Sequence, residues 1–235
     1  MRPFKQRQYW DTPPWDLSDT MRRAMDLVEM LLEVKPVRRV RVTPDVRPAL
    51  VVASDAQVEP GDWPGGGVLI HDPLGQKVAR HLQFRQGCLT EWGLTLEDIA
   101  NGKQPIALCE AAMLPLAMIA MPEVFRGRSV VWYVDNTSAM ASFVKGASAN
   151  AHLERIVAIF WMCSFLLKAT IWVEWVDSEG NWSDGLSRAL AADRFVVDHG
   201  FETAEILPEM AWWSEPLLAV WNRLTRLLSE QALGR

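Results

Sequence analysis

The sequence predicts an α/β fold in which helices flank a mixed sheet of five strands. Short runs rich in β-branched and aromatic residues recur along the chain, and longer apolar segments of helical character separate the later ones. Their order is three strands, a helix, a strand, two helices, a strand and a final helix, which is typical of a mixed sheet with helices on its faces. With 235 residues, 49% of them hydrophobic, the chain is long enough for one sizeable core or for a domain with an appendage.

The first 37 residues, 1–37, are predicted to form an N-terminal arm and a helix. The arm begins with MRPFKQRQ, a basic stretch without acids. The helix is expected over residues 16–34, with Ser18 at its N-cap. Its apolar residues recur at helical spacing on one face: Met21, Met25, Val28 and Leu32. A linker punctuated by prolines follows and contains a short basic strand candidate, VRRVRV.

Residues 38–190 are predicted to form the main domain, and its first half contains three strands. The segment ALVVASDA is a β-branched run that includes Asp55. After a turn rich in glycine and proline, EPGDWPGGG, the segment VLIHDPLGQKVARHLQF is expected to form two strands joined at Asp72–Gly75. Residues 85–104 are expected to be a loop with one short helix near Thr95 to Ala100.

The second half of this domain alternates helices and strands. Residues 105–121 predict an apolar helix that starts near Pro105 and that Pro115 should kink or shorten. Further helices are expected at residues 138–145 and 151–168. The strands are expected at SVVWYVD and TIWVEWV, and NWSDGLSRAL starts the last helix.

Residues 191–235 are predicted to form a helical extension rich in tryptophan. Ser214 and Pro216 suit the start of a helix. One apolar stripe follows at helical spacing, made of Leu217, Val220, Trp221, Leu224 and Leu228. Trp212, Trp213 and Trp221 are expected to pack against the core or a partner, whereas the tryptophans inside strands are expected in the core or half-buried in the sheet: Trp132, Trp172 and Trp175.

Charge and cysteine content limit the classes of function. Residues 1–48 carry ten Lys and Arg against seven Asp and Glu, while the other 187 residues carry 14 against 22. A nucleic-acid enzyme of this charge is expected to rely on another domain or subunit for basic surface. The three cysteines form no CxxC pair, which favours an intracellular location, nuclear or cytoplasmic, with an organelle left open by the basic arm. The apolar runs are too short for a membrane span.

Four acids stand where a metal site would form. Asp55 and Asp135 each lie at the end of an apolar strand, and Glu110 interrupts a helix that is otherwise apolar all round. Asp184 opens the last helix of the main domain. Neighbouring buried carboxylates repel one another, and a divalent cation removes that repulsion. Simpler explanations stay open, because Asp184 also suits the helix dipole and Asp55 also suits a turn cap.

Four segments containing these acids resemble the ribonuclease H domain of retroelement reverse transcriptases, in particular those of DIRS-like and Ty3-like elements. The segments are VVASDAQ, IALCEAAMLPLAMI, VVWYVDNTSAMASFVKG and NWSDGLSRAL. The resemblance covers roughly residues 38–190 and is most specific at Asp135-Asn136-Thr137 and at residues 181–188. It implies a ribonuclease H-like fold, with residues 1–37 in the place of a connection to a polymerase domain.

The resemblance also implies a two-metal reaction on an RNA–DNA hybrid. Asp55 would bridge two Mg²⁺ ions, Glu110 and Asp135 would complete the ion at the leaving group, and Asp184 would hold the ion that activates water. Mn²⁺ can replace Mg²⁺ in an all-carboxylate site, and the lack of clustered His or Cys argues against zinc. Residues expected to contact the hybrid, or another RNA substrate, are Asn136, Ser138, Asn181 and Trp63, the last of which suits a loop anchor equally well.

Three functions follow from these observations. The first is a metal-dependent endonuclease that cleaves the RNA strand of RNA–DNA hybrids. The second is a domesticated module of the same fold that serves a larger ribonucleoprotein as a structural or RNA-contacting subunit. The acidic charge and the long tryptophan-rich tail favour it. The loop WVDSEGN favours it too, because it lacks the histidine that many members of the resembled family have there, and Glu179 is the candidate proton shuttle in its place. The third, a transposase or resolvase of this fold, fits the NWSDGLSRAL segment less well.

Overall fold

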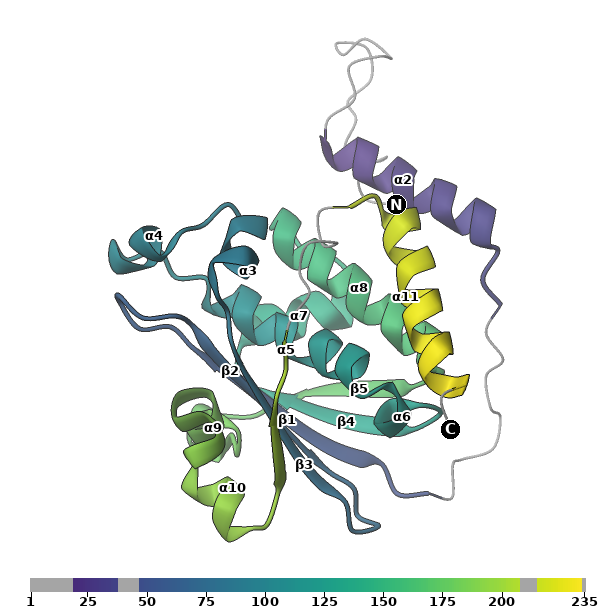
Figure 1. Ribbon diagram of the computed structural model, residues 1–235. Helices are drawn as coiled ribbons and strands as arrows, with labels where there is room; N and C mark the ends of the chain where they lie inside the picture. The colour runs from purple at the N-terminus through teal and green to yellow at the C-terminus, as the bar shows by residue number, and fades with distance from the viewer. Residues whose placement is uncertain (1–18, 38–46, 208–214, 234–235) are drawn as a thin grey trace.

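The fold is built on a six-stranded mixed sheet with helices on both faces (Figure 1). The computed structural model describes residues 19–37, 47–207 and 215–233. The order of strands across the sheet is β5-β4-β1-β2-β3-β6. In chain order the strands are β1 (Leu50–Gln57), β2 (Gly65–His71), β3 (Lys77–Gln83), β4 (Ser129–Val134), β5 (Thr170–Trp175) and β6 (Glu202–Glu205).

The first three strands form an antiparallel meander, and the later strands join it in parallel. β1 pairs with β2 and β2 with β3 in antiparallel fashion, and the turn at Asp72–Gly75 joins the last two as expected. β4 lies parallel to β1, with Leu50 opposite Val130, and β5 lies parallel to β4. Because β1 and β4 are parallel neighbours, the residues at their carboxyl ends meet at one edge of the sheet.

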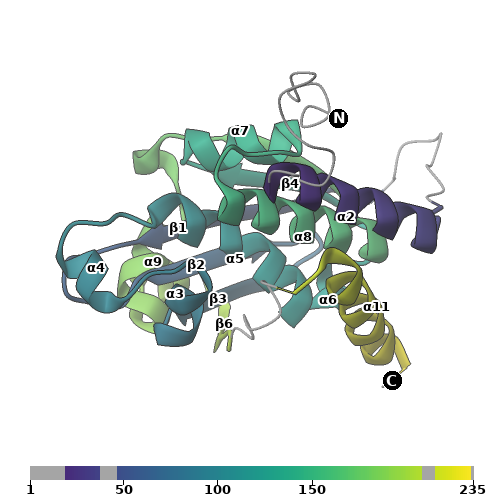
Figure 2. The same ribbon diagram turned by 90° about the horizontal axis from the view of Figure 1, so that it is seen from above.

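Most helices cover one face of the sheet, and α9 and α10 lie on the other (Figures 1 and 2). The longer helices are α2 (Asp19–Val34), α5 (Ile106–Ala120), α7 (Thr137–Lys145), α8 (Ala151–Leu167) and α11 (Leu217–Leu233). The shorter ones are α3 (Gln86–Glu91), α4 (Leu96–Ala100), α6 (Pro122–Phe125), α9 (Asp184–Ala189) and α10 (Arg194–Asp198), with 3₁₀ turns at Ser178–Gly180 and Leu190–Ala192. α11 packs on α8, and α2 packs on α11.

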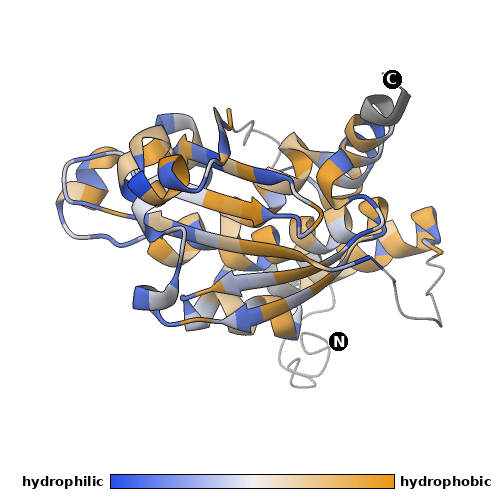
Figure 3. Cartoon of the chain, turned by 90° about the horizontal axis from the view of Figure 1, so that it is seen from below, coloured by the Kyte–Doolittle hydropathy of each residue, from blue (hydrophilic) through white to orange (hydrophobic). Residues whose placement is uncertain are grey.

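The main core lies between the sheet and the layer of α5 and α8, and hydrophobic residues recur along the strands that face it (Figure 3). Its centre is Trp132 of β4, whose ring is fully buried against Phe143 and Phe160. The indole Nε1 of Trp132 donates a hydrogen bond to Ser54 Oγ on the neighbouring strand (2.7 Å). A buried indole needs such a partner, so this bond fixes the ring across β1 and β4. The core therefore holds together the two strands whose ends carry Asp55 and Asp135.

Three glycines let helices of both layers approach β2 closely. A side chain at Gly65 would collide with the carbonyl oxygen of Ser187, and one at Gly67 would come within 3.0 Å of Leu186. On the opposite face, Gly66 lies directly against Met113 of α5. The expectation that these glycines belong to a turn is wrong, because they begin β2. The close approach they allow brings α9, with Asp184 at its start, onto the strand next to Asp55.

The sheet has one strand more than predicted. Residues Glu202–Glu205 form β6, which pairs in parallel with β3. The prediction of five strands and of an all-helical extension after residue 190 is therefore wrong. All four residues of β6 are exposed and none alternates with a buried neighbour, so the periodicity of a half-buried strand is missing. Only its pairing with β3 identifies it.

The structure confirms some of the local predictions about helices and burial and contradicts others. Two helices, α3 and α4, occupy residues 85–104 where a loop with one helix was expected. Pro115 lies inside α5 and does not shorten it. Trp172 is 66% exposed and Trp175 47% exposed, so their expected burial in the sheet is wrong, because β5 is an edge strand. The stripe on α11 is confirmed, since its five residues are buried.

On α2 the predicted apolar stripe is split. Met21 is buried, but Met25, Val28 and Leu32 are exposed, and Met30 belongs to the main core instead. The remaining predictions concern the arm at residues 1–18 with Ser18, the VRRVRV strand beyond Val37, and Trp212, Trp213 and Ser214. All of these lie outside the described residues.

Candidate metal site

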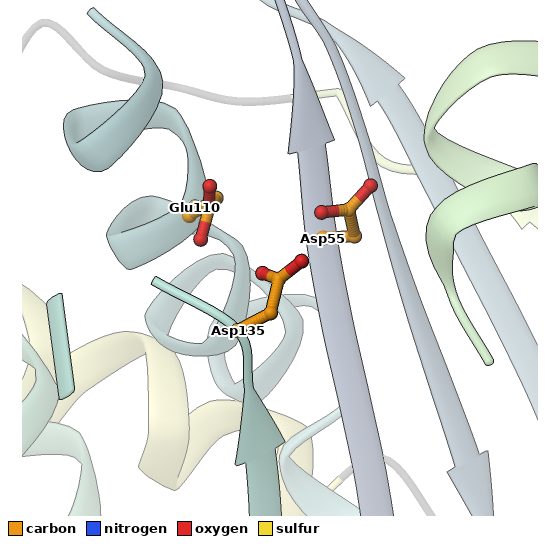
Figure 4. Close-up of side chains that lie close together, drawn as sticks. All are labelled: Asp55, Glu110 and Asp135. Atoms are coloured by element: carbon orange, nitrogen blue, oxygen red, sulfur yellow. The ribbon is translucent and has the colours of Figure 1, made fainter. Parts of the chain in front are cut away.

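Three of the four predicted acids come together beside the carboxyl ends of β1 and β4. Asp55 belongs to β1 and pairs with Gly67 of β2, while Asp135 follows the last residue of β4. Glu110 projects from α5, which packs on β1. Figure 4 shows the three carboxylates pointing toward one another. One oxygen of each lies within 4.8 Å of the others, a spacing that can hold a metal ion.

The three acids are largely removed from solvent. Asp55 is 4% exposed and Glu110 is 5% exposed, while Asp135 is half-buried. They line a pocket of about 250 Å³ whose wall also includes Asp184 and Arg188. The other lining residues are Ala56, Gln57, Val58, Glu59, Ile106 and Ser178. Five carboxylates and one guanidinium thus face a single opening.

Burial and mutual repulsion raise the pKa of two of these acids. Burial raises the pKa of Glu110 from 4.5 to about 9, and the charges of Asp135 and Asp55 add to this rise. Burial also raises the pKa of Asp55, from 3.8 to about 6; the hydrogen bond from Ser187 opposes this, and Asp135 and Asp184 reinforce it. The site therefore favours any positive charge, proton or metal, that is placed between the carboxylates.

Two carboxylate oxygens in the site lack a hydrogen bond from the described residues. They are Glu110 Oε2 and Asp135 Oδ1, and both are buried. A buried carboxylate oxygen without a donor is costly in free energy unless a cation or a proton compensates it. An all-carboxylate set of donors suits a hard divalent cation. The residues present therefore fit a metal ion.

Asp184 lies in the same pocket but outside the compact group of three. Its Oδ1 accepts hydrogen bonds from Arg188 Nε (3.2 Å) and Arg188 Nη2 (2.9 Å), one helical turn farther along α9. Its charge acts on Asp55, whose pKa it raises. The structure thus brings Asp184 to the site and pairs it with a cation of the protein itself.

Ser187 links Asp55 to α9, a role that the sequence did not reveal. Its Oγ lies 2.6 Å from Asp55 Oδ2 and 2.8 Å from the carbonyl oxygen of Asp184. Because the hydroxyl has one proton, it donates to one of these acceptors at a time, and the shorter distance favours the carboxylate. Ser187 and Arg188 both belong to NWSDGLSRAL, so the motif contained the signal, but their side-chain directions required the structure.

The residues predicted to contact substrate lie in different surroundings. Asn136 caps α7 by accepting from the Ala139 N–H, and its Nδ2 donates to Glu110 Oε1 (3.4 Å). Ser138 is exposed in the first turn of α7. Asn181 is buried and uses both ends of its amide within the protein, on Ser54 O and on Ser183. Asn136 thus supports the site directly, and the substrate contacts of all three stay predictions.

Trp63 and Glu179 were singled out as residues of loops. Trp63 is half-buried and packs against the main core, which agrees with the loop-anchor alternative, and it does not line the pocket. Glu179 is exposed in the 3₁₀ turn, next to Ser178 at the pocket wall. Its role as a proton shuttle stays a prediction.

Comparison with known proteins identifies no family. No protein-family model matches the sequence, and no curated protein matches it. Within the part of the chain that the structure describes, none of the helices has the length and apolar character needed to cross a membrane. The site itself is therefore the main basis for a functional conclusion.

Proposed function

We propose that the protein is a Mg²⁺-dependent endonuclease that cleaves the RNA strand of RNA–DNA hybrids. The observation that carries this proposal is the group of Asp55, Glu110 and Asp135, with two buried oxygens that lack hydrogen-bond donors among the described residues. The mixed sheet is compatible with a ribonuclease H-like fold, and Asp184 lines the same pocket as the other three acids. The order of the acids along the chain matches the resemblance drawn from the sequence.

Each residue of the site has a proposed role that follows from its position. A bound divalent cation would supply charge stabilisation for a phosphodiester displacement and a more acidic water, and Mn²⁺ can stand in for Mg²⁺. Asp55, Glu110 and Asp135 would hold it, with Asn136 and Ser187 orienting two of these carboxylates through hydrogen bonds. Asp184 lines the same pocket from α9, which lies on the face of the sheet opposite α5, the helix that carries Glu110 (Figure 1).

The residues that line the pocket carry more negative than positive charge, which is unfavourable for binding nucleic acid. Glu59 lies beside the four acids, and Arg188 is the one cationic residue among the residues that line the described pocket. Phosphate contacts dominate the affinity for nucleic acid and require basic residues. We therefore propose that a polymerase domain or another subunit supplies the basic surface that holds the hybrid.

Cleavage of labelled duplexes tests the proposed function. The full chain is incubated with Mg²⁺ and an RNA–DNA hybrid, double-stranded RNA or double-stranded DNA carrying the same sequence. We expect cleavage of the hybrid's RNA strand only, with a loss of at least about a thousandfold in Asp135→Asn, because removing one charged ligand weakens the metal and its charge stabilisation together. Asp198→Asn, an exposed acid at the end of α10, is the matched control and should keep wild-type activity.

Absence of cleavage would contradict the nuclease proposal. If wild-type protein with a native circular dichroism spectrum leaves the hybrid intact at every Mg²⁺ and Mn²⁺ concentration, the alternative of a non-catalytic module in a ribonucleoprotein is favoured. The acidic pocket wall is the observation that supports this alternative. Equal cleavage by wild type and Asp135→Asn would show that the activity comes from elsewhere.

A further inference from the structure

The two halves of the acid pocket differ in how their charge is balanced. On the side of α5, Glu110 and Asp135 each have a buried oxygen without a donor among the described residues. On the side of α9, Asp184 is paired with Arg188 by two hydrogen bonds. One half of the site therefore lacks a cation from the described residues, and the other half already contains one.

The guanidinium of Arg188 interacts electrostatically with other carboxylates besides that of Asp184. Its hydrogen bonds to Asp184 raise the pKa of Arg188, and the charges of Asp55 and Glu59 raise it further. Three carboxylates on this side of the pocket thus act on one cation of the protein. A guanidinium is always charged and binds carboxylates with both directional hydrogen bonds and charge, so it competes with a metal ion for them.

The exposure of the pair makes this competition reversible. The Arg188 side chain is 58% exposed and that of Asp184 is 43% exposed, so water screens the pair. Exposed ion pairs at this spacing contribute little to the stability of a protein. Arg188 can therefore leave Asp184 without disturbing α9, whose Ser187 and Leu186 are buried against the sheet.

We infer that Arg188 is a built-in counter-ion that keeps the Asp55–Asp184 half of the site closed to a second divalent cation until that cation displaces it. This inference rests on the proposed function, because it assumes that the Asp55–Glu110–Asp135 half binds the first ion. It assigns the two halves different affinities: the half without a cation fills first, and the half held by Arg188 fills only at higher metal concentration.

Mn²⁺ binding to the full chain tests the inference without any activity measurement. Free Mn²⁺ is measured by electron paramagnetic resonance during titration at pH 7.5 and fixed ionic strength, because salt screens the ion pair. The wild type should bind one Mn²⁺ tightly and a second weakly. In Arg188→Gln the second ion should bind about tenfold more tightly, with a smaller change for the first.

Two further variants make the result specific. Arg194→Gln removes the same charge from another i,i+4 pair, Arg194 with Asp198 on α10, and should leave both affinities unchanged. In the background of Asp184→Asn, the change Arg188→Gln should no longer tighten the second ion, because the carboxylate that it frees is missing.

The outcomes separate this inference from the proposed function. If the first ion binds and Arg188→Gln leaves the second affinity unchanged, the inference is wrong and the proposed metal site stands. If the tightening is the same in the Asp184→Asn background, Arg188 acts through general charge and the inference is again wrong. If neither wild type nor Arg188→Gln binds a first ion while folded, the proposed function fails and the inference fails with it.

Discussion

Raising the pH from 5 to 9 should lower the free energy of unfolding of the metal-free protein, and Glu110→Gln should remove most of that dependence. The pKa of Glu110 is about 9 in the folded protein against 4.5 for an ordinary glutamate, and that of Asp55 is about 6 against 3.8. Both folded-state values are raised, so the folded protein keeps protons that the unfolded chain releases. The resulting loss of stability begins above pH 4 and is complete only above pH 9.

The size of this effect follows from the linkage between protonation and folding. Each unit of pKa difference corresponds to about 1.4 kcal/mol, so the full shift of Glu110 corresponds to a loss on the order of 6 kcal/mol, of which about 5 kcal/mol falls between pH 5 and 9. Urea denaturation at pH 5, 7 and 9 in the presence of a chelator measures it. Burial lowers the pKa of His81, which works in the opposite direction near pH 6, so the difference between wild type and Glu110→Gln is the informative quantity.

A control variant distinguishes the site from a general effect of charge. Glu97→Gln removes an exposed carboxyl from α4, away from the site, and should retain the wild-type profile. An identical pH profile for wild type and Glu110→Gln would mean that the carboxyl of Glu110 loses no protons on unfolding. That result would contradict its burial beside Asp55 and Asp135.

Trp132→Ala should destabilise the protein by about 3–5 kcal/mol, the usual cost of truncating a fully buried tryptophan. The ring is 0% exposed and contacts Phe143 and Phe160, and the change also leaves Ser54 without its indole partner. Because Trp132 joins β1 to β4, we expect the loss to reach the ends of both strands and to weaken metal binding at Asp55 and Asp135.

The matched comparison is Trp172→Ala on the neighbouring strand. Trp172 is a strand tryptophan like Trp132, but it is 66% exposed on the edge strand β5. Its removal should change the free energy of unfolding by less than about 1 kcal/mol. Chemical denaturation of the two variants measures the difference, and equal destabilisation would contradict the packing described for the core.

The sequence was sufficient to find the three grouped acids because each stood out from its own element. Asp55 interrupted an apolar strand near its end, Asp135 followed another, and Glu110 was the one acid in an apolar helix, so local pattern and the cost of burying charge identified them. Their approach to one another depends on β4 lying beside β1, a long-range pairing that no local pattern contains. Distances of a few ångströms between carboxylates follow only from that pairing.

Other features of the structure could not be predicted from the sequence, for physical reasons. β6 has no hydrophobic alternation, since all of its residues are exposed. The exposure of Trp172 follows from the position of β5 at the edge of the sheet, and strand order is a property of the whole fold. Arg188 was visible as a charge near Asp184, but its double hydrogen bond depends on the direction of two side chains on α9.

Proton release on metal binding tests most directly whether Asp55, Glu110 and Asp135 form a metal site. Mg²⁺ or Mn²⁺ is titrated into the full chain at pH 8 by calorimetry in two buffers of different ionisation enthalpy. Because the pKa of Glu110 is about 9, its carboxyl is mostly protonated at pH 8, so the first ion should displace that proton and release most of one proton per ion. Glu110→Gln should bind more weakly and release almost none. Binding without proton release, or equal binding by wild type and Glu110→Gln, would contradict the assignment of these acids to one metal site.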